Sequence, residues 1–119
     1  MSYYTYYTME AKNTKTNAPL SEEMEAIVAR RLWEISDNAI FEGDNLDVCL
    51  SDSLKWYDHE EDLVALSREF PDIMFKLEGE GEDRSDMWCM YAQNGEWEVC
   101  EAKIVYEEPE NPKFRKEFF

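Results

Sequence analysis

Basic residues are scarce in this sequence. Twelve lysines and arginines stand against 28 aspartates and glutamates, so the formal net charge is −16 in 119 residues. A field this negative repels nucleic acid and anionic membrane surfaces, which argues against direct binding to either. It attracts basic surfaces instead, such as those of proteins that hold nucleic acid. The alternative is a generic role in solubility, because acidic surfaces also keep proteins in solution.

Long apolar stretches are also missing. No apolar run approaches the ~18 residues that mark a membrane-spanning helix. Residues 1–8 lack the basic start and the apolar stretch of a secretion signal. We therefore expect a cytoplasmic protein that does not contact membranes.

Histidine and paired cysteines, which build many catalytic relays and metal centres, are scarce. His59 is the only histidine, so neither a Ser-His-Asp relay nor a multi-histidine metal centre can form, and we expect it at the surface or beside a helix cap. Cys49, Cys89 and Cys100 contain no Cys-x-x-Cys pair, which fits neither a disulfide framework nor a zinc or iron–sulfur site. We predict reduced thiols, with Cys89 and Cys100 as small apolar residues inside strands. No metal, no cofactor and no enzymatic turnover are expected.

The sequence does contain enough apolar and aromatic material for one packed domain. Apolar residues make up 44% of the chain and 17 side chains are aromatic, which argues against disorder despite the charge. The charge is uneven, since residues 42–110 hold 21 acidic and five basic side chains. We predict a single α+β domain over residues 1–106. A linker containing Pro and Glu and a short basic, aromatic C-terminal tail follow at 107–119.

Apolar periodicity predicts two helices. Ser21 is a suitable N-cap for a helix over residues 21–36. The apolar stripe of this helix consists of Met24, Ile27, Val28, Leu32 and Ile35. Asp58 and Glu61 have the spacing of a capping box for a second helix over residues 59–70.

Runs of β-forming and alternating residues predict the strands, at residues 3–9, 54–57, 73–77, 87–92 and 97–106. Residues 48–50 are interpreted as a further short strand or edge segment. Asn94-Gly95 between the last two strands is the strongest short hairpin signal available. The predicted order is β-α-β-α-β-β-β. This is an α+β fold with two helices on one face of an antiparallel-rich sheet, a variant of the ferredoxin-like arrangement.

Several short motifs occur together in the second half of the chain. They are Lys55-Trp56-Tyr57-Asp58-His59-Glu60-Glu61-Asp62, Ser67, Phe70-Pro71-Asp72, Gly79-Glu80-Gly81-Glu82 and Asp86-Met87-Trp88. In these motifs, residues 54–105 resemble the YubB-like ferredoxin-fold domain found on bacterial plasmids, in prophages and in phages. The resemblance implies that fold and a mobile-element origin. It implies neither an iron–sulfur cluster nor catalytic residues.

A row of acidic side chains is the main candidate site. Glu78, Glu80 and Glu82 alternate with glycines, so along an extended strand they share one face at a separation of ~6.6–6.8 Å. That spacing is comparable in scale with the phosphates along one nucleic-acid strand. The other acidic members of the patch are Asp83 and Asp86 from the loop, and Glu96 and Glu98 from the hairpin. A solvated edge that discourages aggregation is the alternative interpretation.

Trp33 is the one aromatic candidate for a partner contact. It lies off the apolar stripe of the first predicted helix, on the side of Ala29 and Arg30. If half-exposed there, it is a plausible hot spot in an interface.

Together these features predict a non-enzymatic phage or mobile-element protein. Its acidic surface would mimic nucleic acid and block a basic nucleic-acid-binding surface of a host protein, such as a CRISPR effector or a defence nuclease. Two alternatives stay open: an accessory or structural domain with a generic acidic coat, and a small enzyme that uses carboxylates and a divalent metal. No oligomeric state follows from the sequence.

Overall fold

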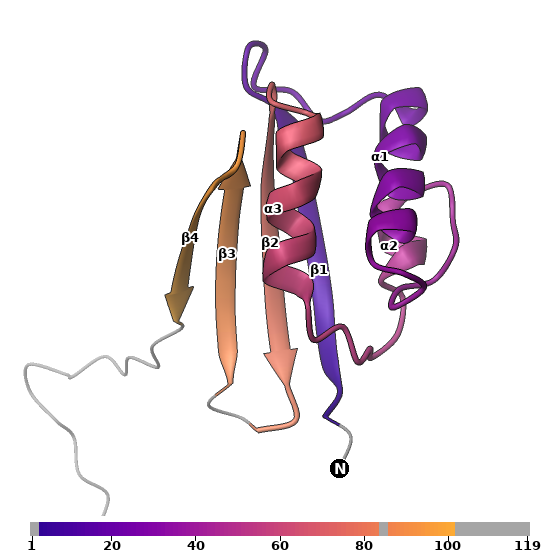
Figure 1. The fold of residues 1–119 in the computed structure, drawn as a ribbon. Coiled ribbons are helices and arrows are strands. Elements are labelled where there is room, and N and C mark those ends of the chain that lie inside the picture. The colour runs from indigo at the N-terminus through magenta and orange to yellow at the C-terminus, as the bar shows by residue number, and fades with distance from the viewer. Residues whose placement is uncertain (1–2, 84–85, 102–119) are drawn as a thin grey trace, which may run out of the picture.

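Four strands and three helices make up the described part of the chain, residues 3–83 and 86–101, in the computed structural model (Figure 1). They are β1 Thr5–Asn13, α1 Glu22–Ile35, α2 Leu46–Cys49, α3 His59–Glu69, β2 Ile73–Gly81, β3 Met87–Gln93 and β4 Glu96–Glu101. The fold is α+β, as predicted. Residues 102–106 of the last expected strand, and the expected linker and tail at 107–119, lie outside the described residues.

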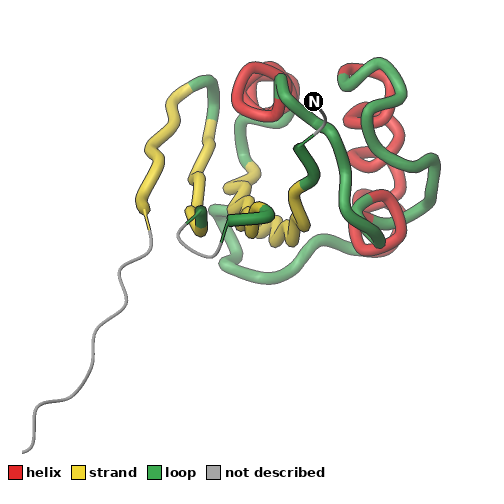
Figure 2. Tube along the Cα trace, turned by 90° about the horizontal axis from the view of Figure 1, so that it is seen from below, coloured by secondary structure: helices red, strands yellow, loops and turns green. Residues whose placement is uncertain are grey.

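The strands form one antiparallel sheet in the order β1-β2-β3-β4. Asn94 and Gly95 join β3 to β4 as predicted, with φ angles of 48° and 84°. A two-residue hairpin turn of this kind requires positive φ at both positions. All three helices lie in the connection between β1 and β2. Figure 2 shows the helices gathered on one side of the sheet.

The ferredoxin-like order is not confirmed, because the observed order is β-α-α-α-β-β-β. The strand expected at 54–57 is reduced to one bridge between Leu54 and Thr5. Trp56 turns into the core there and is 1% exposed. Its carbonyl oxygen accepts a hydrogen bond from the Tyr7 hydroxyl at 3.0 Å and lies 3.1 Å from Nδ1 of His59, instead of joining a strand ladder.

Local capping explains where two of the helices begin. Ser21 Oγ accepts a hydrogen bond from the backbone N–H of Met24 at 3.2 Å, which is the predicted N-cap. Asn45 caps α2 through the N–H of Val48 at 2.9 Å, so the segment expected to be extended from Val48 onward belongs to a short helix and its C-cap. Asp58 stands at the N-cap of α3, but its side chain makes no cap hydrogen bond. The predicted capping box is therefore wrong.

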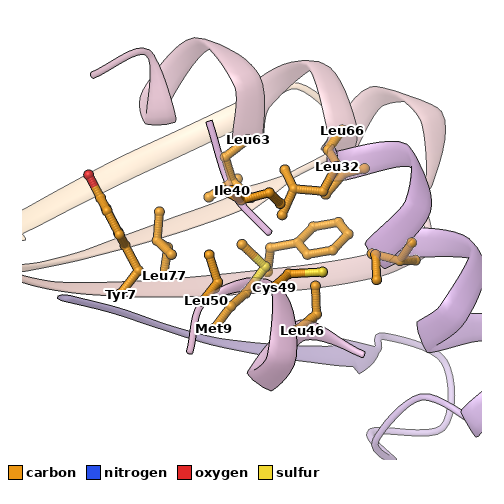
Figure 3. Packing of buried hydrophobic residues seen from close by; sticks show 14 of the residues in the cluster. Tyr7, Met9, Leu32, Ile40, Leu46, Cys49, Leu50, Leu63, Leu66 and Leu77 are labelled. Carbon is orange, nitrogen blue, oxygen red and sulfur yellow. The ribbon is translucent and has the colours of Figure 1, made fainter. Parts of the chain in front are cut away.

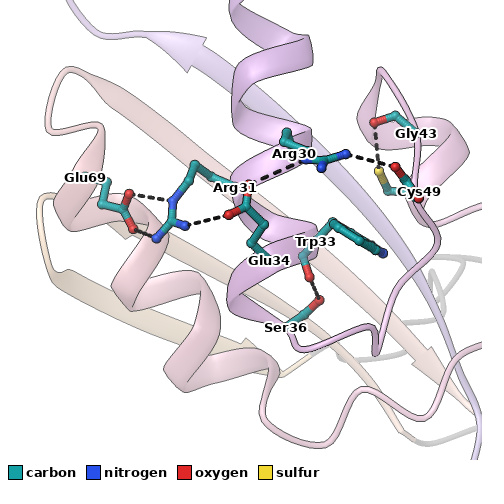
Figure 4. A network of polar contacts seen from close by, with 9 residues as sticks. Arg30, Arg31, Trp33, Glu34, Ser36, Gly43, Cys49 and Glu69 are labelled. Atoms are coloured by element: carbon teal, nitrogen blue, oxygen red, sulfur yellow. Dashed lines mark hydrogen bonds and ion pairs between the residues drawn. The ribbon is translucent and has the colours of Figure 1, made fainter.

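Ion pairs orient α1 against its neighbours (Figure 4). Arg31 binds Glu69 of α3 through two hydrogen bonds, Nε to Oε1 at 2.7 Å and Nη2 to Oε2 at 2.8 Å. These bonds raise the pKa of Arg31 and lower the pKa of Glu69. Arg30 reaches Glu42 in the loop before α2 at 2.8 Å. Because all these side chains are well exposed, solvent screens each pair and its contribution to stability is small.

The core lies between the sheet and the helices (Figure 3). Its largest fully buried side chains include Leu32, Trp56, Leu63, Leu66, Phe75, Leu77 and Met90. The predicted stripe of α1 is only partly right. Val28 is buried, whereas Met24 and Ile27 are 38% and 52% exposed and Ala29 takes an inward position. The helix packs against α3 and α2 rather than flat on the sheet, which changes the face it buries.

Candidate functional site

The two faces of β2 account for the alternation of glycine and glutamate near its end. Gly79 faces the helices, and the ring of Trp88 from β3 packs over it so closely that an added Cβ would overlap the ring. Glu78 and Glu80 therefore face the opposite side of the sheet, which no helix of the described residues covers. We call this side the open face. Its outward residues are Tyr6, Thr8, Glu10, Lys12, Met74, Lys76, Glu78, Glu80, Met87, Cys89, Tyr91, Gln93, Glu96, Glu98 and Cys100.

The predicted acidic row exists on the open face, but it is shorter than expected and includes a cation. Glu78 and Glu80 are exposed and occupy alternate positions of β2, as the sequence indicated. Lys76 occupies the preceding position on the same face, with its Nζ 3.2 Å from Oε1 of Glu78. This contact raises the pKa of Lys76. Among the described residues the row thus contains Glu80, for which no ion-pair partner is seen, and Glu78, which is paired with Lys76 at the surface.

Glu96 and Glu98 add negative charge from β4 to the same face. Glu98 is directly opposite Tyr91 of β3 in the antiparallel ladder, and Tyr91 is directly opposite Lys76 of β2. Both glutamates are exposed. With neighbouring strands ~4.8 Å apart, the acidic side chains of β2 and β4 are separated by roughly 10 Å across the sheet. The hairpin therefore extends the patch, as predicted.

The loop acids do not simply continue the row. Glu82 lies beyond the end of β2, and its Oε1 accepts a hydrogen bond from the backbone N–H of Tyr4 at 3.0 Å. Asp86 is half-buried and accepts a hydrogen bond from the Tyr3 hydroxyl at 2.6 Å, on the helix side of Gly81. Asp83 is exposed, and its backbone N–H donates to the same hydroxyl at 3.3 Å. The Tyr3 hydroxyl thus contacts both Asp83 and Asp86, and Asp86 faces away from Glu78 and Glu80.

Trp33 lies on α1, within the helical layer and away from the acidic patch. It is half-buried and packs against the core. The guanidinium of Arg30 lies 4.9 Å from its ring centroid. A cation that already covers the ring reduces the surface that a partner could contact. The structure does not bring Trp33 together with the predicted acidic residues.

His59 lies beside a helix cap, as one of the two expectations had it, at the first position of α3 after Asp58, but its ring is packed rather than at the surface. Its ring stacks on Trp88 with centroids 4.6 Å apart and planes at 18°. Because a carbonyl oxygen can only accept, the short contact with Trp56 O assigns Nδ1 of His59 as the hydrogen-bond donor. A hollow of about 290 Å³ opens beside the stack, lined also by Glu60, Asp86 and Glu101.

A second hollow, of about 360 Å³, lies on the open face. Its lining includes Glu78 and Glu80 together with Cys89 and Cys100, which are directly opposite each other in β3 and β4. The sequence interpretation treated these cysteines as separate apolar residues. A signal was present, however: counting outward from the Asn94-Gly95 turn pairs Gln93 with Glu96 and, four steps on, Cys89 with Cys100.

Within residues 3–83 and 86–101, no group of three or more His, Cys, Asp or Glu side chains is arranged to hold a metal ion. In the same residues, no helix has the length and apolar character that crossing a bilayer demands.

Comparisons of this chain with protein-family models, with curated proteins and with solved structures found no match.

Proposed function

We propose that this protein is a non-enzymatic binding protein that occupies a basic, nucleic-acid-binding surface of another protein. The observation that supports this most directly is the exposure of Glu78 and Glu80 on alternate positions of β2, on a sheet face with no helix over it in the described residues. Glu96 and Glu98 add two exposed carboxylates two strands away. Carboxylates fixed on a sheet keep their spacing, as phosphates do on a nucleic-acid strand.

The expected mechanism is electrostatic attraction followed by steric exclusion of nucleic acid. A net charge of −16 accelerates encounter with a basic surface, and opposite charges can raise association rates by 10–1,000-fold at low salt. The pair between Lys76 and Glu78 lies at the surface, where ion pairs are weak, so a partner's arginine or lysine can replace Lys76 at little cost. Tyr6, 61% exposed on the same face, offers a ring for cation–π contact with such a side chain.

The resemblance of residues 54–105 to YubB-like domains supports a mobile-element origin in this proposal. For a phage or plasmid protein, the fitting partners are host proteins with large basic grooves, such as CRISPR effectors and defence nucleases. Their nucleic-acid channels are lined by lysine and arginine, which is the surface that an acidic mimic complements.

The test uses a variant in which only the open face loses charge. Glu78, Glu80 and Glu98 are replaced together by Gln, which keeps the side-chain size and removes three charges. Affinity purification from the natural host at low salt should capture a basic nucleic-acid-binding protein with the parent chain. Duplex DNA should displace that protein, and the Glu78→Gln/Glu80→Gln/Glu98→Gln variant should associate with it at least ten times more slowly.

A matched control removes the same number of charges from the helical layer. Glu23, Glu60 and Glu61 are exposed there, and their replacement by Gln changes the net charge equally. This control should slow association far less than the open-face variant. Equal effects of the two variants would show that only net charge matters, and unchanged binding by the open-face variant would show that the acidic face is a solubility device.

A further inference from the structure

Cys89 and Cys100 lie opposite each other in the β3–β4 hairpin. The register pairs Met90 with Val99 and then Cys89 with Cys100. Residues directly opposite in an antiparallel pair have Cα atoms ~4.5–5.5 Å apart. Disulfides bridge Cα atoms ~4.4–6.8 Å apart and Cβ atoms ~3.5–4.5 Å apart, whereas opposite Cβ atoms in a ladder lie ~4.5–5.5 Å apart. The two thiols can therefore be joined after a small approach of β3 and β4.

Both thiols are open to small reagents. Cys100 is exposed and Cys89 is partly exposed, and both line the hollow on the open face. Tyr91 shares the open face with Cys89, and interaction with the Cys89 side chain raises the pKa of Tyr91. Cys49 differs from this pair because it is fully buried in the core. The chain therefore offers one accessible thiol pair and one protected thiol.

We propose that Cys89 and Cys100 form a reversible disulfide site that is oxidised by low-molecular-weight disulfides. The Cys100 thiolate attacks one sulfur of the reagent, and half of the reagent leaves as a thiol that takes up the proton lost by Cys100. The Cys89 thiolate then attacks the Cys100 sulfur, forms the Cys89–Cys100 bond and releases the second half as a thiol with the remaining proton. Two electrons pass from the protein to the reagent.

This site goes beyond the proposed binding role and does not depend on it. β4 is exposed at all six positions, so few contacts other than the ladder with β3 hold it. A bond between Cys89 and Cys100 fastens β4 to β3 in the observed register. It thereby fixes the position of Glu98 relative to Glu78, and the oxidised hairpin should resist unfolding more than the reduced one.

The experiment treats the reduced native protein with hydroxyethyl disulfide, a neutral reagent that the acidic face does not repel. Intact mass should fall by two hydrogens with no reagent attached, and titratable thiols should fall from three to one. Because no Lys or Arg lies between the two cysteines, cleavage after Glu96 or Glu98 is needed to show the cross-linked peptides. Dithiothreitol should reverse every change.

Two variants distinguish formation of the intramolecular Cys89–Cys100 disulfide from other thiol reactions. Cys49→Ser should oxidise as the parent does. Cys100→Ser should stop at a mixed disulfide on Cys89, because no second thiol can displace the reagent. The proposal is overturned if the parent keeps stable mixed disulfides on Cys89 and Cys100, if it forms disulfide-linked dimers instead, or if Cys49 appears in the cross-link. The mass and thiol measurements on the parent protein need no substitution, so they test the proposal even if a variant fails to fold.

Discussion

Replacing Gly79 by alanine should destabilise the protein through a clash with one ring. Gly79 is buried and directly opposite Trp88 in the sheet. An alanine Cβ would overlap two ring atoms of Trp88 and lie 2.9 Å from a third, Cη2. The ring cannot move away freely, because it stacks on His59 and meets Tyr7 edge-on at 6.0 Å.

The magnitude follows from two opposing effects. Overpacking a rigid site costs roughly 1–3 kcal/mol. Alanine in a strand regains roughly 0.5–1 kcal/mol relative to glycine, because glycine loses more chain entropy on folding. We expect Gly79→Ala to lower the free energy of unfolding by about 1–2 kcal/mol, which is roughly 5–10 °C in Tm for a domain of this size.

Urea unfolding followed by circular dichroism measures this cost, and a double-mutant cycle assigns it to the ring. In a Trp88→Leu background the same Gly79→Ala change should cost less than about 0.5 kcal/mol, since the clashing atoms are gone. Glu80→Ala, whose side chain faces the open side, is the matched control and should stay within about 0.5 kcal/mol of the parent. If Gly79→Ala cost the same in both backgrounds, the packing of Trp88 over Gly79 would be refuted.

Two further predictions concern titratable side chains. Burial raises the pKa of Asp62, whose Oδ2 accepts the indole N–H of Trp56 at 2.7 Å; a raised folded-state pKa means that stability from this group is lost as pH rises. Asp62→Asn should therefore become more stable than the parent as pH rises above the ordinary carboxyl range, whereas Asp62→Ala should lose about 1–3 kcal/mol because the buried N–H of Trp56 loses its acceptor. Thermal unfolding of the parent and both variants across pH measures these differences, and an Asp62→Asn variant that is never more stable than the parent would contradict the raised pKa. The Arg31 hydrogen bonds lower the pKa of Glu69, so that pair stabilises the fold above the ordinary carboxyl range and is lost as pH falls through the lowered pKa. Arg31→Lys should lower stability slightly near neutral pH and have almost no effect in acid, and an equal loss at both pH values would contradict an ionic origin.

Features that depend on a few neighbouring residues could be predicted from the sequence. Ser21 could be assigned as a cap because its hydroxyl needs only the next turn of backbone. The hairpin at Asn94-Gly95 followed from backbone sterics alone. The alternation of Glu78 and Glu80 with glycine predicted one acidic face of a strand, since the period of two is a property of extended backbone.

The same reasoning could not predict contacts between residues that are far apart in the sequence. Asp86 looked like a member of the acidic row, yet a hydroxyl 83 residues earlier in the chain, that of Tyr3, holds it on the helix side. Trp56 looked like the end of a strand, yet it is a core residue whose carbonyl oxygen is satisfied by Tyr7. Periodicity places Ile27 on the apolar face of α1, but it does not say which elements α1 packs against, and Ile27 is exposed.

By itself the sequence determined the α+β composition, the two long helices, the hairpin and the negative charge of one strand face. These depend on backbone periods, turn sterics and composition, which act over a few residues. Only the tertiary structure decided that Asp86 binds Tyr3 on the helix side, that Trp88 fills the space left by Gly79, and that all three helices fall between two paired strands. Those outcomes depend on which distant side chains compete best for the same buried space and the same hydrogen-bonding groups, and that competition exists only once the chain has folded.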